Sequence, residues 1–417
     1  MVDSMIDLGA VEVFADAGAL HRMMAEVSAF GATPGGGVNR MAATPEEGRA
    51  RDWLRGWFAA HGFRTLVDPI GNLVGVLDLA GDGAPLVLSG SHLDSQPFGG
   101  RFDGAYGVVA ACQAALAIRA AGGRPTHNLG VVSWTNEEGA RFQPSLVGSS
   151  VFAGLLGLQD ALRIRDGDGV AIGDALAAIG YRGADSIPHP AAYVELHVEC
   201  GPELEASGQP LGVMEGWWGA LKLRLSFLGA QSHTGPTAMA LRRDALRAAG
   251  VLIAAIGGLA DEAKRDGPEV LYTSVGRLEV EPNSPNVIPG RATLFIELRS
   301  PRAEVLAGAE TALMAQVAAA AASARVGWRI DSRLYRPSGR FDPGLVALAR
   351  EIRPEAQRLT TVAAHDAIPL STLCPAVVVA TPSVGGMCHH EAEFTRPEDL
   401  EQGLRLLTAM LWRLCNQ

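Results

Sequence analysis

Short apolar runs alternate with helical segments through the first half of the chain. The runs Leu86–Leu88, Leu129–Trp134 and Tyr193–Leu196 are each followed by polar or glycine-rich residues, which is typical of buried strands that end at the surface. Between the first two runs, Tyr106–Ala121 is apolar over a length that suits a helix. This alternation of strand and helix predicts a mainly parallel sheet covered by helices.

The pattern changes near Gly216. From Leu221 to Phe227, apolar residues alternate with polar ones, which predicts a strand with one face in water. The next elements are predicted to be a helix, two strands, a helix and a strand, at about Ala238–Leu259, Tyr272–Val280, Ala292–Leu298, Arg302–Ala324 and Trp328–Leu334. The order β-α-β-β-α-β is that of a ferredoxin-like layer.

The first pattern returns near the C-terminus, with the apolar run Ala376–Ala380. Capping boxes at Thr44–Glu47 and Thr395–Glu398 predict helices that end near Gly62 and Leu414. The sequence therefore predicts an α/β fold. Residues 1–214 and 333–417 form the domain with the mainly parallel sheet, and residues 215–332 form an inserted ferredoxin-like α+β domain.

Composition narrows the choice of partner and compartment. The net charge is −10 and there is no long basic run, so we expect neither nucleic acid nor membrane as a partner. The five cysteines are odd in number and lack CxxC spacing, which favours reduced thiols and a cytoplasmic location. Residues 1–18 have no basic segment of the kind that opens a signal peptide. The alanine-rich segment before Ala324 is interpreted as a helix of the fold, not as a membrane span.

Polar clusters follow the predicted strands. They contain His92 with Asp94 and Asp103, then Glu137 with Glu138, then His197, and finally His389; the insertion adds His233. Side chains at the carboxyl ends of strands in an open α/β sheet converge on one crevice. Several imidazoles and carboxylates there can hold two divalent ions, with one carboxylate bridging them. A mixed set without thiolates suits Zn²⁺ or Mn²⁺.

Adjacent Glu137 and Glu138 call for different roles. Two neighbouring carboxylates repel each other unless a cation neutralises one of them. If Glu138 binds metal, Glu137 is left to move a proton to and from a metal-activated water. The alternative interpretation is that the pair only begins an exposed turn.

Taken together, these clusters resemble the hydantoinase/carbamoylase family of binuclear-metal amidases. That family includes N-carbamoyl-L-amino acid hydrolases, β-ureidopropionases and allantoate amidohydrolases. The resemblance runs from about Gly31 to Thr395. The matching strings are Gly90–Asp94, Gly99–Gly104, Thr135–Phe142, Glu195–Glu199, Ser232–Gly235 with Met239 and Arg242–Asp244, Pro285–Gly290, Glu297–Arg299 and His365–Ala367.

The resemblance implies two divalent metal ions per subunit, with Zn²⁺ or Mn²⁺ favoured and Co²⁺ or Ni²⁺ also suitable. The implied ligands are His92, Asp103, Glu138, His197 and His389, with Asp103 bridging both ions. The resemblance makes Glu137 the general base and later the proton donor to the leaving nitrogen. It also makes Asp94 the residue that orients His92.

The inserted domain would act as a lid and as the dimerisation domain of a homodimer. Arg299 is expected to grip a substrate carboxylate as a fork. His233 and Asn286 are expected to stabilise the oxyanion or that carboxylate. Lid residues of this family can serve the neighbouring subunit's site.

The chain departs from the family pattern at Cys200, where glutamine is usual and is expected near the ureido or amide group of the substrate. His365 matches a family string, and either a direct role in substrate binding or a structural role fits it. His390 stands where asparagine is usual, and either it or Glu391 can compete with His389 for metal.

These features predict a hydrolase of carbon–nitrogen bonds other than peptide bonds. Its expected substrate is an N-carbamoyl amino acid or a ureido acid, a small molecule with a carboxylate. The first alternative is an N-acyl-amino acid amidohydrolase or dipeptidase of the same fold, which the change at Cys200 favours. The second is a binding protein without catalysis, which the retention of Glu137 and of the whole ligand set opposes.

Overall fold

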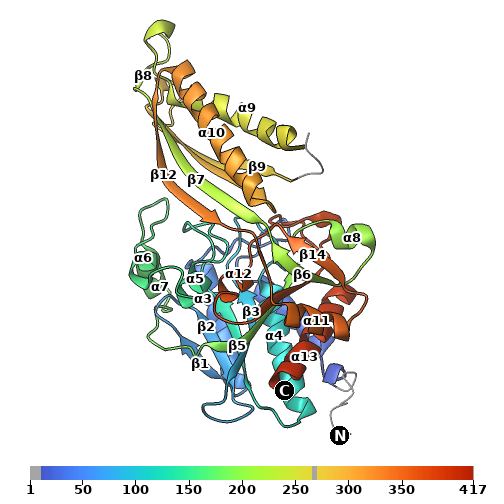
Figure 1. The fold of residues 1–417 in the computed structure, drawn as a ribbon. Helices are drawn as coiled ribbons and strands as arrows, with labels where there is room; N and C mark the ends of the chain where they lie inside the picture. The colour runs from blue at the N-terminus through green and yellow to red at the C-terminus, as the bar shows by residue number, and fades with distance from the viewer. Residues whose placement is uncertain (1–10, 265–269, 417) are drawn as a thin grey trace. The chain divides into compact units, whose positions relative to one another are not determined.

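The computed structural model describes residues 11–264 and 270–416. The prediction that residues 1–18 contain no signal peptide therefore falls largely outside the described residues. The chain packs into two compact units. One unit contains the chain up to Glu215 and again from Phe341, and the other contains Gly216–Arg340 (Figure 1). The predicted boundaries, and the role of the insertion as a lid and dimerisation domain, stay predictions.

The first unit is built on a mixed sheet with strands in the order β1-β2-β4-β3-β5-β15-β6, and β14 also pairs with β6. The neighbours β4, β3, β5 and β15 run parallel, whereas β1, β2 and β6 are joined antiparallel at the sides. The strands are β1 Arg64–Val67, β2 Leu73–Leu77, β3 Leu86–His92, β4 Asn128–Trp134, β5 Pro190–Val198, β6 Gly212–Trp217, β14 Gln357–Thr361 and β15 Ala376–Thr381. The predicted α/β class with a mainly parallel central sheet is confirmed.

Helices pack on this sheet. The most buried is α4, because its sequence is apolar on nearly every side, and it lies against β3, β5 and α13. The helices of this unit are α2 Ala17–Ser28, α3 Pro45–Ala60, α4 Ala105–Ala121, α5 Val147–Phe152, α6 Leu158–Leu162, α7 Ile172–Ala178, α8 Glu203–Ser207, α11 Pro343–Ile352, α12 Ala367–Leu370 and α13 Pro397–Cys415, with a 3₁₀ turn at Val384–Gly386.

The two predicted capping boxes of this unit have different outcomes. The capping of α3 is confirmed, since the Thr44 side chain accepts a hydrogen bond from the Glu47 amide. The capping box at Thr395 is wrong. Arg396 is the N-cap of α13 and has no side-chain cap bond, because Pro397 occupies the first helical position. Strand β3 also runs further than predicted, so that His92 is its last residue.

The second unit contains an antiparallel sheet in the order β12-β7-β11-β9, packed against α9 and α10. Its elements are β7 Gly219–Leu228, β8 Ser232–His233, a 3₁₀ turn at Met239–Leu241, α9 Ala245–Lys264, β9 Tyr272–Glu281, β10 Val287–Ile288, β11 Arg291–Ser300, α10 Ala303–Ala324, β12 Gly327–Arg336 and β13 Gly339–Arg340. The order along the chain matches the predicted β-α-β-β-α-β pattern, with the short pair β8 and β10 added.

Two expectations for this unit are wrong in detail. Helix α9 begins at Ala245 and not near Ala238, because the Asp244 carboxylate accepts the Arg247 amide and fixes the first turn there. Alternation places Ser226 on the wet face of β7, but the residue is buried, and its hydroxyl bonds Thr293 and Asp331.

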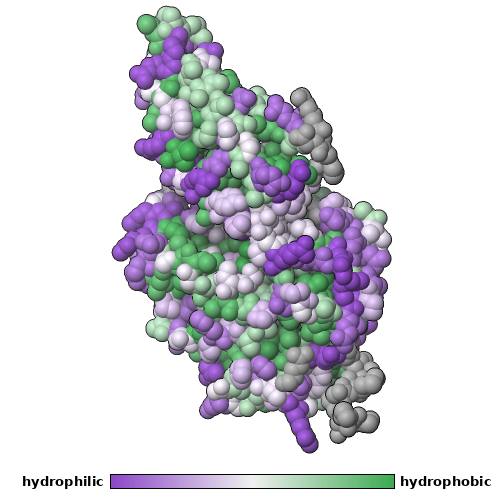
Figure 2. All heavy atoms as spheres, in the orientation of Figure 1, coloured by the Kyte–Doolittle hydropathy of each residue, from purple (hydrophilic) through white to green (hydrophobic). Residues whose placement is uncertain are grey.

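Helix α10 is long and apolar enough to cross a membrane by length and composition alone. Its buried residues, among them Leu306, Leu313 and Val317, instead belong to the apolar core that this unit builds with β7, β11 and α9. Alanine accounts for much of the rest of the helix, which Figure 2 shows as pale green atoms over α10. This packing agrees with its interpretation as a helix of the fold.

Candidate active site

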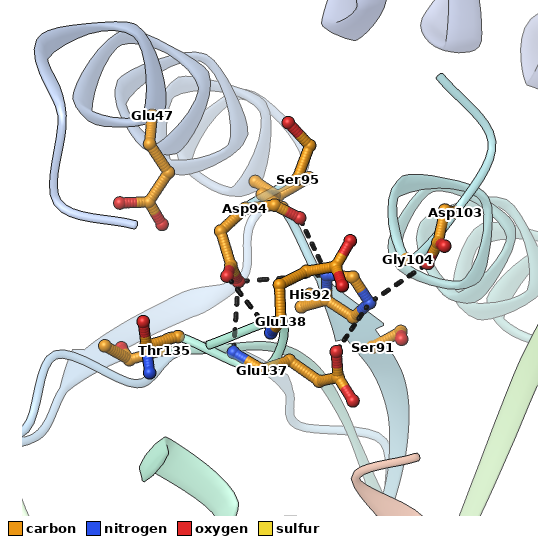
Figure 3. Close-up of polar contacts among 12 residues, drawn as sticks. Glu47, Ser91, His92, Asp94, Ser95, Asp103, Gly104, Thr135, Glu137 and Glu138 are labelled. Carbon is orange, nitrogen blue, oxygen red and sulfur yellow. Dashed lines mark hydrogen bonds and ion pairs between the residues drawn. The ribbon is translucent and has the colours of Figure 1, made fainter. Parts of the chain in front are cut away.

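The polar clusters of the first unit meet because their strands are neighbours in the parallel part of the sheet. His92 ends β3, His197 lies one residue before the end of β5, and Glu137 with Glu138 follows β4. His389 comes from the loop after β15. The carboxyl ends of parallel strands lie at one edge of the sheet, where side chains can converge. Figure 3 shows the part of this convergence around His92.

Asp103 stands at the centre of the cluster. Its Oδ1 atom lies 3.4 Å from His92 Nε2 and 3.2 Å from His197 Nε2. Its Oδ2 atom lies 3.3 Å from His389 Nε2, which is itself 3.2 Å from Glu138 Oε2. The two oxygens of one carboxylate thus face two different sets of ligand atoms. Asp103 groups with His92 and His197 on one side and with Glu138 and His389 on the other.

Hydrogen bonds fix which nitrogen of each buried imidazole is free to bind. His92 Nδ1 lies 2.8 Å from the Asp94 carbonyl, and His197 Nδ1 lies 2.8 Å from the Val198 carbonyl. A carbonyl only accepts, so both Nδ1 atoms carry the proton. The Nε2 atoms therefore present lone pairs toward the Asp103 carboxylate. The Gly104 amide, which points at His197 Nε2 from 3.2 Å, agrees with this assignment.

Two lone pairs that face each other at these distances repel unless a proton or a metal ion lies between them. Burial lowers the pKa of His92, but Glu137, Asp103 and Asp94 outweigh burial and hold the pKa well above its usual value. Burial likewise raises the pKa of Asp103, yet the bonds from His197, His389 and His92 hold it well below its usual value. The cluster thus attracts positive charge strongly. Its donor set of imidazole and carboxylate fits two divalent ions sharing Asp103.

Glu137 is buried, with 6% of its surface exposed, so the interpretation of Glu137–Glu138 as an exposed turn fails. Burial raises the pKa of Glu137 well above its usual value, and His92 opposes the rise. One Glu137 oxygen lies 3.5 Å from His92 Nε2. Glu138 points the other way, toward His389, and Gln96 holds its Oε2 atom at 2.9 Å. The two carboxylates therefore occupy different environments (Figure 3).

Asp94 contacts His92 in a way that the sequence did not predict. Its backbone carbonyl orients the imidazole, whereas its carboxylate is 3.7 Å from Nδ1. That carboxylate instead accepts the amides of Glu137 and Glu138, at 3.2 and 3.3 Å, and so ties β3 to the loop after β4. Burial raises the pKa of Asp94 to about 7.

Glu393 is a site residue that the sequence motifs do not predict. Its Oε1 atom accepts the amides of Phe102 and Asp103 at 2.9 and 3.0 Å and thereby holds the loop that carries Asp103. A Cβ atom on Gly100 would lie 2.0 Å from the Glu393 carboxyl group, so the glycine there makes room for it. The glycines of the Gly99–Gly104 string indicate that something approaches this loop closely. The residue that does so, Glu393, lies about 290 residues away in the sequence.

Gly104 has an equally specific reason to be glycine. Its φ is +67°, and a Cβ atom there would lie 2.4–2.5 Å from the His92 ring. Three residues with side chains also adopt left-handed backbone in the loops that follow the strands, namely Asn136, Cys200 and His389, with φ of +53° to +56°. Such backbone strain in residues other than glycine gathers at functional sites.

Cys200 lies beside this cluster, together with a second thiol. Its Sγ is 2.7 Å from Cys388 Sγ, and Cys388 Sγ is 2.9 Å from Asp103 Oδ2. The hydrogen bond from Cys388 lowers the pKa of Cys200 to about 7. Cys388 was not among the predicted site residues, although it adjoins His389 in the sequence.

His365 is buried against His197, with ring centroids 4.6 Å apart, and its Nε2 atom is 3.2 Å from the Thr361 hydroxyl. It groups with His197 and Glu195. Glu195 in turn accepts from the Ser91 hydroxyl and the Ala367 amide at 2.8 Å each. These contacts tie His365 to the frame that supports His197.

The structure separates the predicted site residues of the second unit into two groups. His233 and Asn286 adjoin each other, since β8 pairs with β10 through His233 and Val287, and both side chains are exposed. Arg299 lies at the far end of β11 and pairs with Glu297 at 2.9 Å. Strand β11 begins at Arg291, three residues after the end of β10. At about 3.3 Å per residue, roughly 25 Å of strand separates the two groups.

Comparison with known proteins shows the family of this chain. The sequence profile of peptidase family M20/M25/M40 matches residues 88–413. A protein from Mycolicibacterium smegmatis, named only as a hydrolase, is 45% identical, with 94% of this chain and 92% of that protein covered. An N-carbamoyl-L-amino acid amidohydrolase of Geobacillus stearothermophilus is 33% identical, covering 95% of this chain and 98% of its own.

Among solved structures, an amidase of the hydantoinase/carbamoylase family from Burkholderia vietnamiensis is similar over the whole fold. Its TM-score is 0.92 at 37% identity, with 97% of this chain and 98% of that chain covered. The fold and the candidate site thus define a metal-dependent amidohydrolase. The chain belongs to peptidase family M20/M25/M40, within the hydantoinase/carbamoylase group of amidases. The prediction of a hydrolase for carbon–nitrogen bonds other than peptide bonds is confirmed.

Proposed function

We propose that this enzyme hydrolyses the ureido carbon–nitrogen bond of an N-carbamoyl amino acid or a related ureido acid. The observation that carries the proposal is the Asp103 carboxylate, whose two oxygens face two separate ligand sets beside a buried glutamate. The relative from Geobacillus stearothermophilus is named for hydrolysis of N-carbamoyl-L-amino acids, which supports this substrate class.

In this proposal, His92 and His197 would hold one divalent ion, Glu138 and His389 would hold the other, and Asp103 would serve both. Two divalent ions bound here, Zn²⁺ or Mn²⁺ in first place, would polarise the substrate carbonyl and acidify a water molecule. The His389 side chain is 52% exposed while that of His92 is 1% exposed, so substrate approaches from the side of His389. Neither His390 nor Glu391 is needed as a ligand.

Glu137 serves as the proton carrier. Its buried position favours the neutral carboxylic acid in the absence of nearby positive charge, as the raised pKa indicates. It accepts a proton from the attacking water and returns it to the leaving nitrogen. For a carbamoyl substrate, the products are the amino acid, ammonia and carbon dioxide.

The second unit supplies the remaining binding groups. The Gly235 amide donates to His233 Nδ1 at 3.0 Å, so the neutral ring carries its proton on Nε2 and can donate to an oxyanion. We assign Asn286 to the same task. The Arg299 guanidinium grips the substrate carboxylate, and Glu297 orients it.

We also propose a homodimer formed through this unit. His233 lies on β8, near the start of β11, and Arg299 lies near the end of β11. The roughly 25 Å of strand between them is too long for both to reach one small substrate from the same chain. A second subunit resolves this conflict if it supplies one of the two. Strand β12 is an edge of its sheet and exposes Trp328, Ile330 and Leu334, which suits burial against another copy. The free cysteines fit the cytoplasmic location that we propose.

Replacing Glu137 by glutamine tests the mechanism. We expect turnover to fall by about 10³-fold or more, because glutamine cannot accept the proton, while two ions stay bound per chain. Metal analysis by mass spectrometry and single-turnover assays measure the two quantities. Unchanged turnover would show that Glu137 is not the base.

A substrate panel tests the bond that is cleaved. Enzyme loaded with Mn²⁺, Zn²⁺ or Co²⁺ is given N-carbamoyl amino acids and their N-acetyl analogues, and release of ammonia and of amine is followed. We expect cleavage of the carbamoyl set. Cleavage of the acetyl set alone would establish the second candidate, an N-acyl-amino acid amidohydrolase. Cys200 favours that candidate, because a thiol lacks the amide donors and acceptor of the usual glutamine.

A further inference from the structure

We propose that Cys200 and Cys388 close into a reversible disulfide beside Asp103 and that this oxidation lowers turnover. The proposed disulfide is argued only from the positions of the two thiols. Its effect on turnover rests on the proposed function, and the two parts are tested by different measurements.

The two sulfurs are already in contact. They lie 2.7 Å apart, and a disulfide needs about 2.05 Å, so closure requires an approach of roughly 0.7 Å. The residues are 188 positions apart in the sequence. Both thiols are only partly buried, so a small oxidant can reach them, whereas Cys112 and Cys415 are buried.

The strands hold the two cysteines at this spacing. Cys200 follows β5 and Cys388 follows β15, and these parallel neighbours stay paired up to Val198 and Thr381. Burial of both strands leaves them little freedom to part. The left-handed backbone of Cys200 turns its side chain just after the strand ends.

The chemistry balances with a small-molecule disulfide such as oxidised glutathione as the oxidant. One protein thiol attacks the oxidant and releases one small thiol, and the second protein thiol then displaces the other. One protein disulfide and two small thiols result, so two electrons pass to the oxidant. An added dithiol reverses the exchange.

Closure would act on the site through Asp103 and His389. Cys388 Sγ lies 2.9 Å from Asp103 Oδ2, so its single S–H has either this oxygen or Cys200 Sγ as its acceptor. A disulfide has no S–H to donate to Asp103. Cys388 also directly precedes His389, so drawing its sulfur toward Cys200 shifts the loop that carries this ligand. Both changes fall on the same oxygen and imidazole that face each other at 3.3 Å.

Mass spectrometry tests the linkage in the metal-loaded enzyme. The protein is treated with oxidised glutathione, free thiols are blocked with N-ethylmaleimide, and peptides are mapped. We expect a peptide pair joined through Cys200 and Cys388, about 2 Da lighter than the sum of its parts because two hydrogens are lost, and its loss on adding dithiothreitol. Blocked or glutathionylated thiols at both positions would overturn the linkage. So would protection by bound metal, which would make the thiols metal ligands.

Variants separate the pair from general oxidation. In Cys200→Ser and in Cys388→Ser, the remaining thiol should become glutathionylated without any cross-link. Cys374→Ser is the matched control, because Cys374 is also partly buried, and it should keep the cross-link.

Activity on the best substrate of the panel tests the second part. We expect at least a fivefold drop that follows the cross-linked fraction and recovers with dithiothreitol, in the native enzyme and in Cys374→Ser. A cross-linked enzyme with full turnover would overturn the regulatory role while leaving the linkage intact. If no substrate is cleaved at all, the proposed function is wrong. The disulfide is then still tested by the peptide map, which does not depend on turnover.

Discussion

The two units contribute to the proposed site in contrasting ways. In the first unit, His92, Asp103 and Glu137 are buried. The Asp94 carbonyl holds the His92 ring, and the Glu393 carboxylate accepts the backbone amide of Asp103. In the second, His233 and Asn286 are exposed on a short strand pair, and Arg299 lies at the other end of a long strand. The groups of the first unit are therefore fixed by hydrogen bonds within that unit, whereas those of the second unit are exposed. We expect changes to the proposed ligands of the first unit to cost bound metal, and changes in the second unit to cost only catalysis.

The sharpest way to break this comparison is Asp103→Asn. An amide keeps one acceptor and turns its other side into a donor, so it cannot bridge two cations. We expect bound metal to fall from two ions per chain to less than one, and turnover to fall by more than about 10³-fold. Elemental analysis and steady-state assays check this. If the D103N enzyme kept two ions, Asp103 would not be the bridge at the centre of the site.

A mixed dimer tests the second unit. Glu137→Gln and His233→Ala are each expected to be nearly inactive, while His233→Ala should keep its metal and its melting temperature because the side chain is exposed. If His233 serves the partner's site, a dimer with one subunit of each kind has one intact site. We expect co-expressed, doubly tagged dimers to regain about half of the native turnover. No recovery would mean that His233 acts within its own subunit.

Glu393→Ala measures how far the hydrogen bonds within the first unit matter. The loop that carries Asp103 loses the acceptor for two amides, and we expect metal affinity to fall by about 10–100-fold. Glu393→Gln is the matched control, because its carbonyl can still accept both amides, and it should fall by much less. Metal titration by calorimetry measures both variants. Equal losses would mean that the charge of Glu393, and not its hydrogen bonds, supports the site.

The smallest expected effect concerns stability away from the ligands. Asp68 is buried and bonded to Asn72, which also bonds the loop after β4. Burial raises the pKa of Asp68 to about 6, from 3.8. The folded state therefore keeps this proton while the unfolded state releases it. Stability falls as pH rises from about 4 to 6, by up to about 3 kcal/mol.

Asp68→Asn should remove this contribution to the pH dependence. The variant is less stable overall, because its amide can put a donor opposite the Asn72 amide. The free energy of unfolding of the native protein minus that of the variant should shrink between about pH 4 and pH 7. Urea unfolding at several pH values measures it, and a constant difference would contradict the raised pKa.

The sequence predicted most of the site groups of the first unit because they follow strands. Apolar runs locate the strands β3 and β5, although both strands extend beyond those runs, and parallel pairing brings His92 and His197 together. It missed Glu393 and Cys388, since each touches Asp103 from nearly 290 residues away, and no local pattern encodes such a contact.

Two other errors also have physical causes. Thr395 looks like a cap by composition, but Pro397 moves the helix start so that Arg396 takes that place. Alternation predicts that Ser226 is exposed to solvent, but the residue is buried and its hydroxyl hydrogen-bonds with Thr293 and Asp331. Alternation predicts which face of a strand a residue occupies, not which polar side chains of the neighbouring strands stand beside it on that face.

The left-handed residues Asn136, Cys200 and His389 limit how this enzyme can be altered in the laboratory. Positions 136 and 200 adjoin the reacting groups and are natural choices for a library that seeks new substrates. Valine, isoleucine and threonine would carry a steric cost there before any substrate is tested. A library of glycine, asparagine, aspartate and unbranched residues, with glutamine included at position 200, would avoid this steric cost. Differences in activity among its members would then reflect the side chain and not strain in the backbone.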